Sequence, residues 1–190
     1  MTFYKPDTVV CNGDTFKTFI TQEELTKRTA EIGEQLDKDY EDKKPIFIGV
    51  LNGAFIFMAD LLRHVSIPCE TDFIKLSSYG DAKVSSGQVT ERKELDAKID
   101  GRHVILVEDI VDTGLSMKYL MNKLKDKNPA SVASVTLLHK TEATHHDVQL
   151  DYVGFEIPSA FVLGYGLDYA QEGRNLAQIY IIDEESAKKD

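Results

Sequence analysis

The chain has no tryptophan, two cysteines, five prolines and no apolar run long enough to cross a bilayer. Its longest apolar stretch, residues 54–62, contains Asp60 and falls short of the roughly 20 residues that a membrane helix needs. The N-terminal sequence lacks the basic start and apolar core of a signal peptide. A secreted protein could pair Cys11 with Cys69, but free thiols in a reducing compartment are favoured, and we expect a cytoplasmic protein.

Positive charge is scarce as well. The 22 Lys and Arg residues against 32 Asp and Glu give a formal net charge of -10. Nucleic-acid scaffolds and proteins that dock on anionic membranes need a basic surplus, so this balance argues against both kinds of partner. It leaves room for a small phosphorylated ligand, because backbone amides and a bound cation can hold one locally.

The remaining composition is that of an ordinary globular domain. Apolar residues make up 42% and charged residues 28% of the 190 residues, and no repeat, low-complexity tract or linker interrupts them. We therefore expect one domain over residues 1–190.

Predicted strands and helices alternate along the chain. A Thr-x-x-Glu capping box at Thr21 opens a helix of about 20 residues, as its apolar period indicates. Short apolar runs predict strands at residues 45–51, 69–77, 104–107 and 132–138, with helices at 54–64 and 115–127. This order predicts an α/β fold with a central parallel sheet flanked by helices, in which ligands bind beyond the carboxyl ends of the strands.

One long segment has neither the apolar period of a helix nor the apolar run of a buried strand. Residues 78–93 are rich in small and polar side chains, with Val84 and Val89 as their apolar members. Such a segment forms a long mobile loop or a loose β-hairpin, and long loops in compact domains are often lids.

The chemistry concentrates in Val104–Ser116, where an apolar strand runs into Glu108 and Asp109 and then into Asp-Thr-Gly-Leu-Ser at the start of a helix. Thr113 and Ser116 are expected to cap that helix, and Gly114 lets the backbone approach a ligand. The free amides and the helix dipole form a site for a phosphate group. The two acids suit sugar hydroxyls or a magnesium ion beside it.

Asp-Thr-Gly alone is common in strand–turn–helix units, but two acids, two aliphatics and Asp-Thr-Gly-x-Ser between a strand and a helix are far more specific. The whole pattern resembles the phosphoribosyl pyrophosphate signature of type I phosphoribosyltransferases. The resemblance implies their fold, with a core over about 21–150, a small hood over about 151–182 plus the N-terminal segment, and a flexible lid over about 78–93.

Other segments resemble the hypoxanthine-guanine members of this family, in the same order from about Thr21 to Ile182. Leu51–Ala54 matches their pyrophosphate-binding loop, and Ser78-Tyr79 matches the Ser-Tyr pair of their lid. Lys140 matches the lysine that recognises the exocyclic oxygen of the purine. Residues 151–169 match the hood, and Arg174 matches an arginine that contacts pyrophosphate.

The resemblance implies a role for each matched residue. Binding of phosphoribosyl pyrophosphate falls to Asn52, Gly53, Glu108, Asp109, Ile110, Asp112, Thr113, Gly114, Leu115 and Ser116. Purine binding falls to Lys140, Phe161, Val162 and Asp168, and Mg²⁺ binding to Glu108, Asp109 and Asp168. Catalytic roles fall to Asp112, which takes a proton from the base, and to Ser78, Tyr79 and Arg174. The implied activity is purine salvage from small-molecule substrates by a homodimer or homotetramer.

Two positions depart from the pattern. Asn52 and Ser77 stand where some members have lysine, so we expect less positive charge there. The resemblance implies that the loop at Asn52 works through its backbone, so we expect retained function. In relatives the first bond of this loop is often cis, and we expect a cis peptide at Leu51-Asn52.

The sequence leaves three alternative functions open. A regulator that senses phosphoribosyl pyrophosphate and binds nucleic acid needs a basic face, which a charge of -10 disfavours. A dinucleotide-dependent dehydrogenase needs Gly-x-Gly-x-x-Gly after a strand, which is missing. A phosphoribosyltransferase with another acceptor is disfavoured by Lys140 and Phe161-Val162, although the choice among hypoxanthine, guanine and xanthine stays open.

Overall fold

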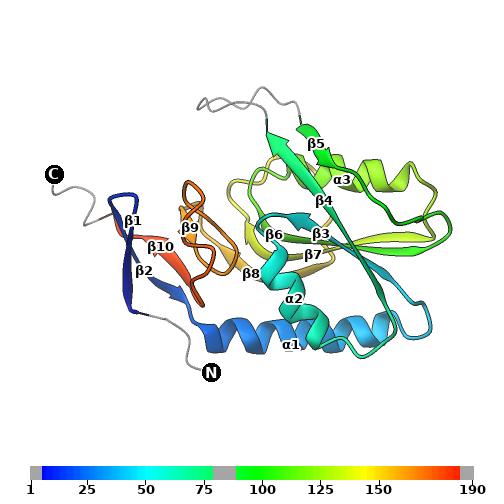
Figure 1. Cartoon of the computed structure of the whole chain (residues 1–190), viewed down its shortest axis with the longest axis horizontal. Coiled ribbons are helices and arrows are strands. Elements are labelled where there is room, and N and C mark those ends of the chain that lie inside the picture. The colour runs from blue at the N-terminus through cyan, green and yellow to red at the C-terminus, as the bar shows by residue number, and fades with distance from the viewer. Residues whose placement is uncertain (1–5, 79–88, 185–190) are drawn as a thin grey trace.

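The computed structural model describes residues 6–78 and 89–184, which form two sheets and three helices (Figure 1). The larger sheet has six strands in the order β5-β4-β3-β6-β7-β8. Their bounds are β3 Ile46–Leu51, β4 Glu70–Ser78, β5 Val89–Lys93, β6 His103–Val111, β7 Ser131–Lys140 and β8 Tyr152–Ile157. All neighbours are parallel except β4 and β5, which confirms the predicted central parallel sheet.

Helices cover both faces of this sheet. Helices α1 (Gln22–Asp39) and α2 (Phe55–Arg63) lie against one face, and α3 (Leu115–Lys125) lies against the other (Figure 1). Alternate residues of the buried strands supply the two cores: Phe47 packs with α1 and α2, whereas Ile46 and Ile48 pack with α3. Burial on both faces explains why these strands are continuous apolar runs.

Helix α1 begins where the capping box predicts. The Thr21 hydroxyl accepts a hydrogen bond from Glu24 N at 3.3 Å, and Thr21 N donates to Glu24 Oε2 at 2.8 Å. On another face Arg28 donates to the carbonyls of Val153 and Gly154, which belong to the edge strand β8. None of the described helices has the length and hydropathy that a membrane-spanning helix needs.

The hood is a four-stranded sheet in the order β1-β2-β10-β9, made from both ends of the chain. Its strands are β1 Thr8–Cys11, β2 Asp14–Ile20, β9 Val162–Leu163 and β10 Ile179–Ile182. We expected the hood to begin near residue 151, but β8 belongs to the large sheet, where it pairs with β7. Strand β8 is half-buried, as expected of an edge strand that pairs with β7 alone. Helix α1 contacts it through Arg28.

Two expectations at the carboxyl end of the sheet need adjustment. Strand β6 runs on to Val111, past its predicted end at residue 107, so Glu108 and Asp109 lie within the strand. Strand β7 likewise runs past its predicted end at residue 138, and Lys140 is its last residue. In the segment predicted as a lid, β5 pairs antiparallel with β4, which is the hairpin alternative; residues 79–88 lie outside the described part of the chain.

Candidate active site

The turn between β6 and α3 has the form of a phosphate cradle. Gly114 is the N-cap of α3, with a φ of 85° that glycine adopts without strain, and it carries no side-chain cap. The prediction that Thr113 and Ser116 cap this helix is therefore wrong. Thr113 Oγ1 accepts only a long bond of 3.4 Å from Leu115 N. A cavity of about 100 Å³, lined by Glu108 and residues 110–117, opens at the first amides of α3.

The two acids of β6 face different cavities. Glu108 lines the cradle, whereas Asp109 lines the neighbouring cavity at the hood. Burial raises the pKa of Glu108 well above its ordinary range, and the charge of Asp109 adds to the effect. Burial also raises the pKa of Asp109, although hydrogen bonds and the charge of Arg174 oppose it. The pair therefore holds a proton more readily than isolated carboxyl groups do.

The turn from β3 into α2 meets the site through its backbone. Its Leu51-Asn52 peptide bond is cis, which confirms the prediction. A Cβ atom on Gly53 would lie 1.6 Å from Asp109 Oδ2, and one on Gly166 would lie 2.1 Å from the Gly53 carbonyl oxygen. Among the described hydrogen bonds, the N–H groups of Asn52 and Gly53 donate to no protein atom, which leaves them available to an anion.

A second cavity, of about 290 Å³, gathers the residues predicted for the base. Its lining comes from four segments of the chain: Asp109, Ile110, Asp112, Lys140, Phe161, Val162, Leu167 and Asp168. Asp112 Oδ2 accepts a hydrogen bond of 2.9 Å from the Lys140 ammonium, so a carboxylate and an ammonium stand side by side at the wall. Opposite polarity at one wall suits a ligand with adjacent donor and acceptor atoms.

The aromatic wall of this cavity belongs to the hood. Phe161 is 43% exposed and meets Tyr169 edge-on, with ring centroids 5.1 Å apart. Phe16 of β2 supports Phe161 from 6.0 Å. Asn12 Nδ2 donates to the Tyr169 carbonyl at 2.9 Å. The Phe161 ring is held in place by its neighbours and is partly exposed, which suits stacking on a planar ligand.

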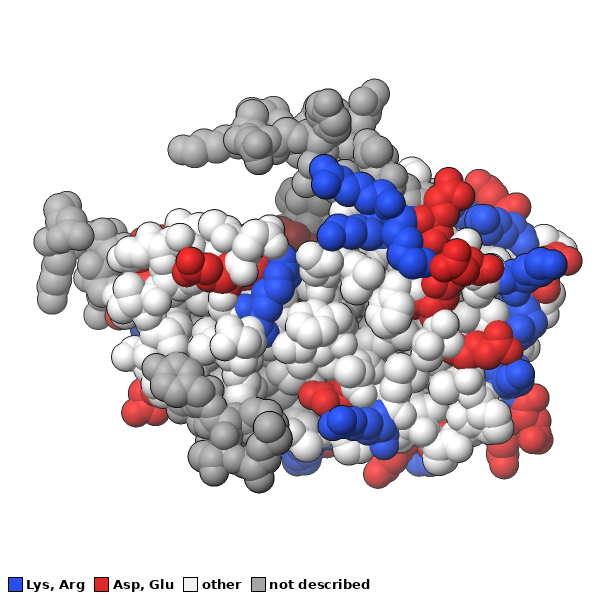
Figure 2. All heavy atoms as spheres, viewed as in Figure 1, with Lys and Arg blue, Asp and Glu red and all other residues white. Residues whose placement is uncertain are grey.

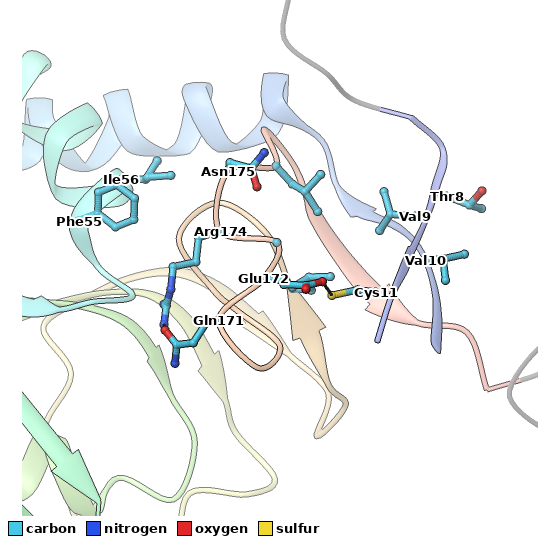
Figure 3. Close-up of a pocket in the computed structure, with 13 residues that line it drawn as sticks. Thr8, Val9, Val10, Cys11, Phe55, Ile56, Gln171, Glu172, Arg174 and Asn175 are labelled. Atoms are coloured by element: carbon cyan, nitrogen blue, oxygen red, sulfur yellow. Dashed lines mark hydrogen bonds between the residues drawn. The ribbon is translucent and has the colours of Figure 1, made fainter. Parts of the chain in front are cut away.

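Arg174 lies on the other side of Asp168. Its guanidinium contacts Asp168 Oδ1 at 2.7 Å, donates to the Gly166 carbonyl at 2.8 Å, and reaches Gln171 Oε1 at 3.3 Å. Figure 3 shows Arg174 and Gln171 together at a larger cavity of about 800 Å³ between the hood and the start of α2. Arg174 thus links the base cavity to the β3–α2 turn.

The donor set fits magnesium held jointly with a substrate. Glu108, Asp109 and Asp168 supply the hard carboxylate oxygens that Mg²⁺ prefers. Within residues 6–78 and 89–184, however, no three His, Cys, Asp or Glu side chains surround one point. Mg²⁺ is commonly held by one or two carboxylates together with substrate phosphates, which agrees with this arrangement.

The structure thus brings nearly all the predicted residues to one edge of the large sheet. Ser78 ends β4 at that edge, while Tyr79 lies outside the described residues. Sequence reasoning missed Leu167, which lines the base cavity, and Gln171, whose N–H holds Asp168 Oδ2 at 2.8 Å. It also missed Thr144, whose hydroxyl donates to the Asp112 carbonyl at 2.7 Å. The contact of Thr144 joins segments 32 residues apart, so no local pattern marks it. Gln171 lies only three residues after Asp168, and a turn after that aspartate was the one local signal for it.

Comparison with known proteins agrees with this geometry. A model of the phosphoribosyl transferase domain matches residues 19–170. The hypoxanthine-guanine phosphoribosyltransferase of Bacillus subtilis is 45% identical over 169 residues, which cover 89% of this chain and 94% of the relative. The enzyme of the same name from Streptococcus thermophilus is 42% identical over 93% of this chain and 98% of its own.

Solved structures give the same result. A crystal structure of a Bacillus anthracis hypoxanthine-guanine phosphoribosyltransferase superposes with a TM-score of 0.84 at 39% identity, over 88% of this chain and 98% of that one. Hypoxanthine phosphoribosyl transferase of Trypanosoma cruzi gives 0.84 at 40% identity, over 90% and 93%. By domain match, identity and fold, this chain belongs to the hypoxanthine-guanine phosphoribosyltransferase family of phosphoribosyltransferases.

Proposed function

We propose that this enzyme transfers the 5-phosphoribosyl group of phosphoribosyl pyrophosphate to hypoxanthine and guanine, giving IMP or GMP and pyrophosphate in purine salvage. The observation that carries the proposal is the base cavity, whose lining joins Asp112, Lys140 and Phe161 directly beside the phosphate cradle of α3. The 6-oxopurine acceptor is supported by the names of relatives at 40–45% identity over most of the chain.

The cradle would hold the 5-phosphate. The first amides of α3 and the positive end of the helix dipole stabilise a phosphate dianion. Residues 112–116 lie close around a cavity of about 100 Å³, which suits one phosphate group. Glu108, at the wall of this cavity, and Asp109 next to it would accept hydrogen bonds from the ribose hydroxyls.

Magnesium belongs to the pyrophosphate side of this arrangement. Asp109 and Asp168, both at the wall of the base cavity, would hold it together with oxygens of the substrate. When bound, Mg²⁺ supplies a Lewis acid that offsets the charge developing on the leaving group. Arg174 and the free N–H groups of Asn52 and Gly53 would bind the departing pyrophosphate from the protein side.

The base side has complementary groups. Lys140 would donate to the 6-oxo group, while Asp112 accepts the proton of the imidazole N–H as the nitrogen attacks the anomeric carbon. Phe161 would stack on the purine ring, and backbone groups of Val162 would contact the edge of the base. Water must be kept from a cation-like transition state, and Ser78 and Tyr79 are proposed to contribute to that exclusion.

We also propose a cytoplasmic homodimer or homotetramer. Cys11 and Cys69 are free, as in proteins of a reducing compartment. Val10 is 73% exposed and Phe55 is 43% exposed, and both line the 800 Å³ cavity. An apolar surface of this kind supports contact with another subunit.

The test is pyrophosphate release from phosphoribosyl pyrophosphate and Mg²⁺ with each purine base in turn, using wild type and Asp112→Asn. The variant keeps the shape of the side chain and lowers its basicity, so kcat should fall by about 10²- to 10⁴-fold. Release only with hypoxanthine or guanine supports the proposal. Binding of phosphoribosyl pyrophosphate without turnover on any base would contradict it and favour a sensor.

A further inference from the structure

The side chain of Asn52 holds an ammonium group from a neighbouring strand. Lys75 Nζ donates to Asn52 Oδ1 at 3.1 Å. Strands β3 and β4 are parallel, with Leu51 opposite Lys75, so the lysine stands level with the end of β3 where the turn begins. The contact therefore places a cation on the turn that carries the free N–H groups of Asn52 and Gly53.

Lys75 differs from the lysine beside it. Lys93 lies opposite Lys75 on β5, but its ammonium is engaged by Asp72 and Asp96, both at 3.1 Å. No carboxylate of the described residues lies within ion-pair distance of Lys75. An ammonium has three donors, and Asn52 uses one, so Lys75 keeps donors and a full charge for a further partner.

The surroundings favour an anionic partner. Figure 2 shows Lys and Arg side chains gathered over the upper ends of β4 and β5, although the chain as a whole carries a charge of -10. The turn itself, Leu51–Ala54, contains no cationic side chain. Gly53 of the same turn lies against Asp109 and Gly166, and the Gly166 carbonyl accepts a hydrogen bond from Arg174. The Lys75 ammonium therefore stands at the edge of the candidate active site.

We propose that Lys75 binds the pyrophosphate end of phosphoribosyl pyrophosphate, with Asn52 as the residue that positions it. Some family members carry a lysine in the loop at the position of Asn52, and in this chain the strand next to the loop supplies the charge. The inference rests on the proposed function, since it assigns a residue to the leaving group of that reaction.

The consequence is specific to one substrate. Losing a charge-assisted hydrogen bond to an anion should raise KM for phosphoribosyl pyrophosphate and the inhibition constant of pyrophosphate by about 10-fold or more. KM for hypoxanthine should change by less than about 2-fold, because the base binds to Lys140 and Phe161 on another wall.

The experiment compares Lys75→Met, Lys75→Arg and the double variant Asn52→Lys/Lys75→Met with wild type. Arginine keeps the charge and should stay within about 3-fold of wild type. The double variant moves the cation into the loop and should recover most of the loss. Lys98→Met is the matched control, because Lys98 is exposed and precedes β6, at the opposite edge of the sheet.

Direct binding of pyrophosphate, measured by calorimetry, separates this inference from the proposed reaction. If wild type turns over no purine, the proposed reaction fails, yet the pyrophosphate affinities of the variants still test Lys75. Unchanged pyrophosphate affinity in Lys75→Met would overturn the inference. Equal rises in KM for phosphoribosyl pyrophosphate and hypoxanthine, together with a lower Tm, would also overturn it. So would a folded double variant that recovers none of the lost pyrophosphate affinity.

Discussion

Gly53 has no room for a side chain, and Gly53→Ala should expose how tightly the β3–α2 turn is fitted to the site. The added Cβ would stand 1.6 Å from Asp109 Oδ2 and 2.4 Å from its carboxyl carbon. Ordinary contact begins at 3.4 Å, so either the carboxylate or the turn must move by roughly 1.8 Å. The turn cannot retreat toward the hood, because its own carbonyl already abuts Gly166.

A shift of this size displaces a residue proposed to hold ribose and Mg²⁺. Misplacement by about 1 Å costs on the order of 10²-fold in rate, so kcat/KM for phosphoribosyl pyrophosphate should fall by at least that factor. A 10²-fold loss corresponds to about 2.7 kcal/mol of transition-state stabilisation. The assay is initial-rate pyrophosphate release at varied phosphoribosyl pyrophosphate, with Tm measured on the same samples.

Gly101→Ala is the matched control. Gly101 has a φ of 67° with nothing within 4 Å of its added Cβ, and it precedes β6 away from the site. That variant should lose about 1 kcal/mol of unfolding free energy and keep its kcat/KM. If Gly53→Ala were folded and fully active, the claim that this turn and Asp109 form one fitted unit would be refuted.

Two further outcomes concern acid stability and the base. Burial alone would raise the pKa of Asp72, but hydrogen bonds from Ala97, Phe73, Lys93 and Asp96 outweigh it and lower that pKa. The stability that Asp72 contributes is therefore present above its ordinary pKa of 3.8 and is lost as pH falls through the lower pKa of the folded state. Chemical denaturation at a series of acidic pH values should show a free energy of unfolding that depends less on pH in Asp72→Asn than in wild type. Tyr169→Leu should raise KM for hypoxanthine roughly 2- to 10-fold by releasing the Phe161 ring, with KM for phosphoribosyl pyrophosphate as the internal control. Equal rises in both KM values would contradict this role.

Sequence reasoning succeeded where one short segment determines its own structure. The strands of the parallel sheet are continuous apolar runs, and helix α1 carries its start signal in Thr21 and Glu24. The segment from Glu108 to Ser116 combines strand, acids and glycine in a fixed order, so its place at the sheet edge could be predicted.

It failed where the outcome depends on distant partners. Strand β8 could not be assigned to the large sheet, because its pattern is mixed and its contact with Arg28 of α1 comes from a distant part of the chain. The prediction for the cap of α3 was wrong because Thr and Ser are common N-cap residues, whereas here Gly114 takes the position in a left-handed conformation. The hydrogen bond between Lys75 and Asn52 could not be predicted either, because Lys75 belongs to another strand.

The hood joins the two ends of the chain, and this sets an order on the making of the enzyme. Gln178 Nε2 bonds Thr18 Oγ1 across 160 residues, and β10 pairs with β2. During synthesis the N-terminal hairpin emerges first and must wait for nearly the whole chain before its partner strand exists. The core sheet and its phosphate cradle can form earlier, while Phe161 gains its support from Phe16 only when the hood closes. The wall that holds the base is therefore among the last parts of the site to be assembled on a growing chain, together with Arg174, which follows Phe161 in the sequence.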